Sequence, residues 1–193
     1  MEIYLKTIEQ IKDEIFGENK EAAQTTPFHE TIDFTFSELY KEIVTNINPT
    51  NISSRCELYN STYSTDITEI FYDVDWIKNE YKKKIKDYWF IGEDNSSDYW
   101  IMDKNGKIFY WESGGYKKKY TLENIMDVNI NFQQWLQFAY IDKDIEEILE
   151  NLFDSGMDEA NYALLENEFK EKYKNKVQEI SKELYELIKS RYD

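Results

Sequence analysis

The chain has 193 residues, of which 39 are acidic and 23 are basic, and it carries a net charge of −16 with one cysteine and one histidine. This length suits one domain with its own core, and a single cysteine excludes an internal disulfide. So acidic a surface excludes ready contact with nucleic acid phosphates and favours basic proteins as partners, unless the charge serves only solubility.

Helical spacing dominates the first fifty residues. Isoleucines recur at the spacing of an amphipathic helix over residues 2–16, and we expect Gly17 to end that helix. Residues 18–31 are polar and include a proline, which indicates a loop. A second helix is expected over residues 37–47, with Ser37 as its N-cap. The apolar side of this second helix consists of Leu39, Ile43 and Ile47.

Residues 52–72 are rich in serine, threonine and tyrosine and show no helical stripe. We therefore expect strands joined by turns, with residues 69–72 (EIFY) as the clearest strand. Asp75 then caps an expected helix over residues 76–85. The apolar side of this helix would be Trp76, Ile77, Tyr81 and Ile85. Its run of lysines suits a C-terminal turn that faces the helix dipole, and a basic binding patch is the alternative.

The segment YWFIGEDNSSDYWIMDKNGKIFYWE, residues 88–112, predicts a meander of three strands. YWFIG is apolar throughout, as in a strand covered on both faces, and EDNSS is turn material. Asn105-Gly106 indicates a hairpin in which both residues accept a positive φ. Side chains should alternate between the two faces of the sheet. We expect Trp100, Met102, Ile108 and Tyr110 to point away from their neighbours Tyr99, Ile101, Phe109 and Trp111. The tryptophans are thus interpreted as core and cross-strand partners.

Helical spacing returns after residue 130. Residues 113–120 are expected to form a flexible turn that leads to a short further strand. A helix then follows Asn131 as its N-cap. A last apolar stripe predicts one long helix over residues 158–190, packed back on the preceding helix or, alternatively, against a partner helix.

The meander and the helix after it resemble the SUKH superfamily, over roughly residues 66–140. This superfamily contains bacterial immunity proteins of polymorphic toxin systems and yeast cell-wall regulators of the Smi/Knr type. The residues that carry the resemblance serve the fold rather than a shared active site. They are Ile91, Gly92, Asp98, Asn105, Gly106, Trp111, Glu112, Phe132, Trp135 and Leu136. Ser97 departs from the family, which often has glycine at this position, and only a faint trace of the family's Leu-Pro motif precedes the first helix.

The resemblance implies an α+β fold with a twisted, mainly antiparallel sheet and helices packed against it. Residues 1–193 would form a single SUKH-like domain, extended by a long C-terminal helix within residues 141–193. In a bacterial member, the resemblance implies an immunity protein that binds and neutralises a cognate toxin. A regulatory scaffold of the Smi/Knr type and an acidic mimic of DNA are the alternatives.

Catalytic groups are scarce in the sequence. His29 has no second histidine with which to bind a metal, and Cys56 is more typical of a core residue than of a nucleophile. Asp94, Asp98 and Asp103 lie close together but lack the register of a calcium-binding loop. No glycine-rich phosphate loop is present. We therefore expect no enzymatic activity, no cofactor and no metal.

The expected partner is a cognate protein toxin with a basic surface, such as a nuclease, rather than nucleic acid or a membrane. Two acidic patches are candidates for the contact, although each is also compatible with an ordinary solvated surface. The first and preferred patch consists of Glu146, Glu147, Glu150, Asp154 and Asp158. The second, among tyrosines, consists of Glu57, Asp66, Glu69, Asp73 and Asp75. The oligomeric state stays open, with a monomer favoured.

Targeting and membrane signals do not stand out in the sequence. The first sixteen residues lack the basic start and unbroken apolar run of a signal peptide. No stretch approaches the roughly 20 apolar residues of a membrane span. We therefore expect a cytoplasmic protein.

Overall fold

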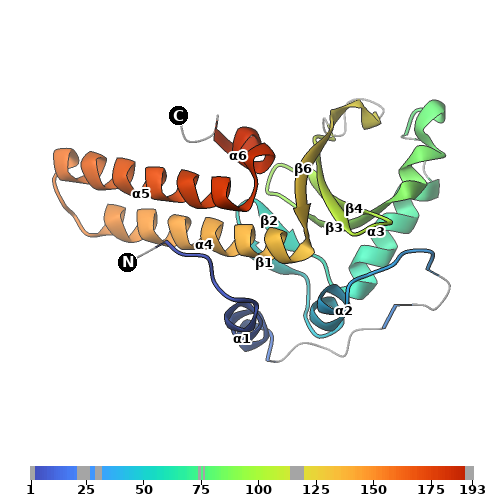
Figure 1. Ribbon diagram of the computed structural model, residues 1–193, viewed down its shortest axis with the longest axis horizontal. Coiled ribbons are helices and arrows are strands. Elements are labelled where there is room, and N and C mark those ends of the chain that lie inside the picture. The colour runs from blue at the N-terminus through green and yellow to red at the C-terminus, as the bar shows by residue number, and fades with distance from the viewer. Residues whose placement is uncertain are drawn as a thin grey trace.

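The computed structural model describes residues 3–20, 27–28, 32–73, 75, 77–113 and 120–189. Six strands form one sheet in chain order, and every neighbouring pair is antiparallel (Figure 1). The strands are β1 (Thr50–Ser53), β2 (Cys56–Leu58), β3 (Tyr88–Glu93), β4 (Tyr99–Asp103), β5 (Lys107–Trp111) and β6 (Ile125–Asn131). The expected α+β class with a mainly antiparallel sheet is therefore confirmed.

Helices cover both faces of this sheet. They are α1 (Ile8–Glu18), α2 (Glu38–Val44), α3 (Ser61–Asp73), α4 (Phe132–Asp154), α5 (Glu159–Ile180) and α6 (Lys182–Ile188). Short 3-10 turns are η1 (Asn79–Tyr81), η2 (Lys84–Asp87) and η3 (Leu122–Asn124). Two predicted caps are confirmed, because Ser37 caps α2 and Asn131 forms a capping box with Gln134 at the start of α4. The predicted cap at Asp75 is wrong, since no α-helix directly follows it.

The predicted alternation in the meander is confirmed. Trp100 and Met102 of β4 belong to the cluster between the sheet and α4, whereas Tyr99 and Ile101 belong to the cluster that contains Phe71 of α3. Residues on β5 divide in the same way. Because successive side chains of a pleated strand point to opposite faces, each strand contributes to both hydrophobic clusters.

The β4–β5 hairpin differs in one detail from the expectation. Of the Asn105-Gly106 pair, only Gly106 takes a positive φ, of 83°. The loop spans the three residues 104–106, since Met102 lies opposite Ile108, and such loops place glycine at the left-handed position. Asp103 fixes the loop by accepting backbone N–H groups from Asn105 at 2.8 Å and Lys107 at 2.9 Å.

The expectation of strands throughout residues 52–72 is wrong for its second half, which forms α3. The physical reason is an edge that β2 leaves open, because β2 ends at Leu58 while β3 continues. Hydroxyl groups one turn apart on α3 occupy this edge. Thr68 Oγ1 accepts the Phe90 N–H at 3.0 Å, Ser64 Oγ donates to Phe90 O, and the Tyr72 hydroxyl donates to Tyr88 O at 2.8 Å. Ser, Thr and Tyr therefore serve a helix here.

The prediction of a helix over residues 76–85 is also wrong. This segment contains η1 and η2, and Ile77 forms an isolated parallel bridge with Tyr120. The Lys78 N–H donates to Tyr120 O at 3.3 Å. A backbone N–H that bonds to Tyr120 cannot also form the i to i−4 hydrogen bond of an α-helix. The segment therefore forms short 3-10 turns instead of a continuous helix. Trp76 lies outside the described residues, as does most of the segment 113–120.

Three helix boundaries differ from the prediction. The helix expected over residues 37–47 ends at Val44. The first helix begins at Ile8 rather than residue 2, because Thr7 forms a capping box with Gln10, and it continues through Gly17. The expected long C-terminal helix is broken at Ser181, which is extended with φ −161° and ψ 134°. The Ser181 hydroxyl donates to Val128 O at 2.6 Å and accepts the Leu184 N–H at 3.2 Å. The break lets α6 pack on β6, whereas α5 packs back on α4 as expected.

Candidate protein-binding surfaces

The structure divides the first acidic patch. Glu146 binds the β1–β2 turn, since both of its carboxylate oxygens accept the Ser54 N–H at 3.1 Å. Asp158 is the N-cap of α5 and accepts the Asn161 N–H at 3.1 Å. These two carboxylates therefore serve the fold. The members left exposed at spacings i, i+3 and i+7 along one side of α4 are Glu147, Glu150 and Asp154.

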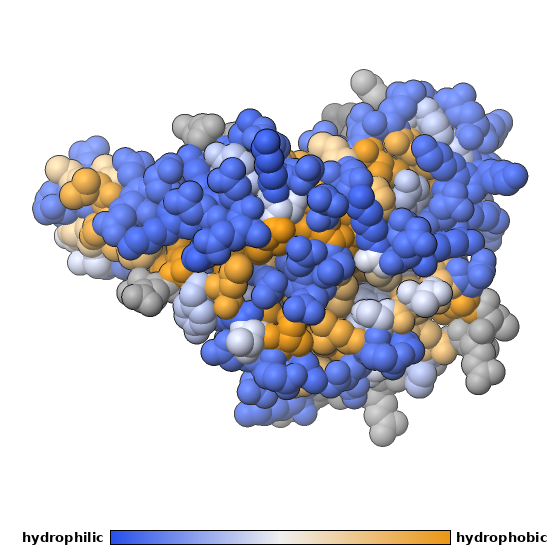
Figure 2. All heavy atoms as spheres, viewed as in Figure 1, coloured by the Kyte–Doolittle hydropathy of each residue, from blue (hydrophilic) through white to orange (hydrophobic). Residues whose placement is uncertain are grey.

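Part of this patch lies on a helical arm, residues 149–172, that contains no fully buried side chain. In Figure 1 the α4–α5 turn lies far from the sheet, and Figure 2 shows hydrophobic side chains at this free end. Phe153 is 75 % exposed and Leu164 is 67 % exposed. The helical arm therefore presents apolar groups beside the acids Glu150 and Asp154.

The second acidic patch stays largely together. Asp66, Glu69 and Asp73 are exposed on α3, opposite the hydroxyl groups that contact β3. Tyr63 and Ile70, which are 37 % and 44 % exposed, lie among them at helical spacing. We call these five side chains the α3 face. Outside it, Asp75 forms an exposed ion pair with Lys82 at 2.8 Å.

Glu57 contributes to the second patch from the sheet. It lies half-buried on β2, directly opposite Glu93 of β3. Burial raises the pKa of both carboxyl groups, and the charge of Glu57 raises that of Glu93 further. Sequence reasoning missed Glu93, because only the pairing of β2 with β3 places the two side by side. The rings of Tyr59 and Tyr63, 4.6 Å apart, connect this pair to the α3 face.

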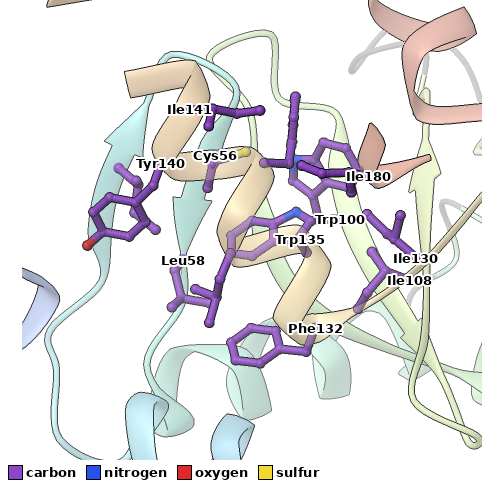
Figure 3. Packing of buried hydrophobic residues seen from close by; sticks show 14 of the residues in the cluster. Cys56, Leu58, Trp100, Ile108, Ile130, Phe132, Trp135, Tyr140, Ile141 and Ile180 are labelled. Atoms are coloured by element: carbon purple, nitrogen blue, oxygen red, sulfur yellow. The ribbon is translucent and has the colours of Figure 1, made fainter. Parts of the chain in front are cut away.

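The residues that carry the SUKH resemblance have structural environments. A Cβ on Gly92 would lie 2.0 Å from the Glu57 carbonyl oxygen, so only glycine permits β2 to approach here. Asp98 accepts the Ser113 N–H at 2.8 Å and thereby ties the β3–β4 turn to the end of β5. Trp135 of α4 packs against both Trp100 and Phe132 (Figure 3). Ile91, Trp111 and Leu136 are also buried, while Glu112 is exposed.

Sequence reasoning also missed a buried ionic cluster. Arg55, on the β1–β2 turn, donates to Asp142 Oδ1 at 2.9 Å, and the Tyr173 hydroxyl donates to the same oxygen at 2.6 Å. The Arg55 carbonyl accepts the Trp100 Nε1–H at 2.7 Å. Together with Glu146, this cluster fixes the turn against α4 and α5. Its partners lie 87 and 118 residues apart in sequence, which is why no local pattern indicates it.

Cys56 and Asp94, two of the residues considered for catalysis or metal binding, have structural environments. Burial, followed by the charge of Asp142, raises the pKa of the Cys56 thiol well above its usual range, and His29 lies outside the described residues. Asp94 accepts the Tyr110 hydroxyl at 2.7 Å and the Ser96 N–H at 2.7 Å, which gives it a role in the β3–β4 turn. The described residues that line a cleft of about 340 Å³ beside Phe36 and Phe132 carry no ionisable group.

Three further findings bear on the candidate surfaces. Within the described ranges, no three potential metal ligands among His, Cys, Asp and Glu lie close enough to share an ion. No helix in the described part of the chain combines the length and apolar character that crossing a membrane requires. No protein-family model, curated protein or solved structure matches the chain.

Proposed function

We propose that this chain is a non-enzymatic immunity protein of the SUKH type, which binds and neutralises a basic protein toxin through the α3 face. The biological role is supported by the SUKH resemblance. The choice of surface is supported by one observation, the mixture of exposed acids with Tyr63 and Ile70 on α3. Aromatic and aliphatic groups supply contact area, while the carboxylates fix register and exclude acidic partners.

The rigidity of α3 favours this surface. Thr68 and Tyr72 bind backbone atoms of β3 on the side of the helix opposite the α3 face. A partner therefore meets side chains that are already in place, so that little conformational entropy is lost on binding. A net charge of −16 also attracts a basic partner over a distance before contact is made.

Two triple variants test the proposal with matched chemistry. Asp66→Asn, Glu69→Gln and Asp73→Asn remove three charges at spacings i, i+3 and i+7 from α3. Glu147→Gln, Glu150→Gln and Asp154→Asn remove three charges at the same spacings from α4. Each is co-expressed with toxin domains encoded at the same locus, and growth rescue and pull-down are measured. Because both variants change the net charge equally, a difference between them reports the contact surface.

We expect the α3 variant to weaken binding by about tenfold or more and to lose rescue, while the α4 variant stays close to wild type. Loss in the α4 variant alone would move the contact to the helical arm and contradict the proposed surface. Failure of every toxin domain from the locus to bind the wild-type chain, or turnover of a substrate by the purified chain, would contradict the proposed function.

A further inference from the structure

The helical arm carries apolar side chains that its own two helices do not cover. Close to the sheet, α4 also packs on β1 and β6, whereas residues 149–172 extend away from the sheet (Figure 1). Five large apolar side chains are exposed among the described residues, and the two with the highest exposed fractions, Phe153 and Leu164, both lie on the arm. Two helices that lack a third layer bury only the side chains between them, so the arm is open to a partner.

Phe153 belongs to an apolar patch that spans both helices of the arm. Its ring packs edge-on against Tyr162 of α5, with ring centroids 6.4 Å apart and an interplanar angle of 82°. Leu149, which is half-buried one turn earlier at i−4, extends the patch along α4. Leu164 lies on a different side of α5, because two residues after Tyr162 correspond to about 200° around the helix. We call Leu149, Phe153 and Tyr162 the Phe153 patch.

The charge around the Phe153 patch indicates which kind of partner can cover it. Residues 147–165 hold five acidic residues and no basic one. The bases on either side of this stretch, Lys143 and Lys170, already form ion pairs with other carboxylates. Glu150 and Asp154 are exposed beside the patch. A partner that covers the apolar side chains therefore has to bring positive charge next to them.

The occupant that fits this surface is a helix of another protein rather than a second copy of this chain. A second copy would bring the same acids against Glu150 and Asp154, and each copy carries a net charge of −16, so that two copies repel each other. Two antiparallel helices leave a groove along the seam between them. A third helix fills such a groove in helical bundles and in complexes where an amphipathic helix is bound.

We propose that the helical arm binds a basic amphipathic helix of a partner protein across the Phe153 patch. Apolar residues of that helix, spaced three or four apart, would cover the patch, while lysines or arginines beside them would face Glu150 and Asp154. This contact is separate from toxin binding, because α3 and the arm lie at opposite ends of the molecule (Figure 1). Both surfaces can therefore be occupied at once.

Two synthetic peptides test the proposal on the full chain. Both are about 18 residues long, or about five helical turns, and share one leucine stripe, but one has lysine and the other glutamate at every remaining position. The chain is labelled at its leucine and isoleucine methyl groups, and their NMR resonances are followed during titration. We expect the lysine peptide to shift Leu149 in a saturable manner, while Leu164 and Ile70 of the α3 face stay unchanged. The glutamate peptide should shift none of them.

Two matched variants of the arm separate the Phe153 patch from general acidity. Phe153→Ala and Leu164→Ala each remove one mostly exposed side chain, so both chains should fold as wild type does. Phe153→Ala should bind the lysine peptide about tenfold more weakly or worse, because an aromatic anchor is lost, whereas Leu164→Ala should bind it as wild type does. The α4 triple variant should also bind the peptide more weakly, and the α3 triple variant should not.

A shift of Ile70 with the same midpoint as Leu149 would overturn the proposal, because the peptide would then respond to acidity alone. Equal binding of the lysine peptide by Phe153→Ala and wild type would contradict it as well. Self-association of the wild-type chain that Phe153→Ala abolishes would place a second copy on the patch instead of a basic helix. Toxin binding should be the same in Phe153→Ala and wild type, and its loss in that variant would show that the arm is not a separate contact.

Discussion

Replacing Thr68 by valine should weaken the fold by removing one hydrogen-bond acceptor. Thr68 is fully buried on α3, and its Oγ1 accepts the Phe90 N–H at 3.0 Å. Phe90 points this N–H away from β4, toward the edge that β2 leaves open, and it is itself fully buried. Valine keeps the shape of threonine but offers no acceptor, so the N–H is left buried and unpaired.

An unsatisfied buried N–H costs about 1–3 kcal/mol. Part of this loss is offset, because the variant no longer buries a hydroxyl. We expect the free energy of unfolding to fall by about 2 kcal/mol, which lowers the urea midpoint by about 1 M for a slope near 2 kcal/mol per molar. Exchange of the Phe90 amide hydrogen should also accelerate.

Thr65→Val on the same helix is the matched control. The Thr65 hydroxyl donates to Ser61 O at 2.8 Å within α3, and that carbonyl keeps its helical partner when the hydroxyl is lost. The control should change stability by less than about 0.5 kcal/mol. Equal stabilities of Thr68→Val and Thr65→Val, at an unchanged denaturant slope, would refute the idea that side chains of α3 complete the edge of β3.

Three further predictions concern the sheet. Gly92→Ala should destabilise by about 1–3 kcal/mol in thermal unfolding, since its Cβ would meet Glu57 O at 2.0 Å, whereas Gly17→Ala, with nothing within 4 Å, should be neutral or stabilising. Cys56 should react with a disulfide reagent only as fast as the chain unfolds, because burial raises its pKa; rapid labelling of the native chain would contradict this. Burial raises the folded-state pKa of Glu57 and Glu93 above 4.5, so the folded state binds more protons than the unfolded state. The free energy of unfolding should therefore fall as pH rises from 4.5 through the raised pKa values. Glu57→Gln should make the free energy of unfolding, measured by urea titration, depend less on pH.

Features set by local geometry were predictable from the sequence. The alternation of Tyr99 and Ile101 with Trp100 and Met102 follows from the pleat of a single strand, whatever lies beside it. Ser37 and Asn131 cap helices through the backbone of their own first turn. Even here, only Gly106 of the Asn105-Gly106 pair takes the positive φ that both residues can adopt.

Features that depend on distant partners were not predictable. The serines and threonines of α3 are typical of strands in the sequence, and only the free edge of β3 explains their place on a helix. The apolar stripe of the last helices continues across Ser181, so periodicity alone cannot reveal a break that Val128, 53 residues earlier, stabilises. At the candidate site, the sequence gives no sign that Glu146 differs from an exposed acid, because its partner Ser54 lies 92 residues away. Glu93 lies next to Glu57 only because β2 pairs with β3, which no local pattern indicates.

The two sides of α3 link the fold to the proposed function. One side replaces a missing strand through Thr68 and Tyr72, and the other presents the α3 face to a partner. Because the contacts of the first side hold the second in place, Thr68→Val should also weaken toxin binding, but only through the fraction of chains that open locally. Its loss of affinity should therefore disappear under strongly folding conditions such as added osmolyte, which favour compact states. The loss in the α3 triple variant should persist there, since its cause lies in the contact itself.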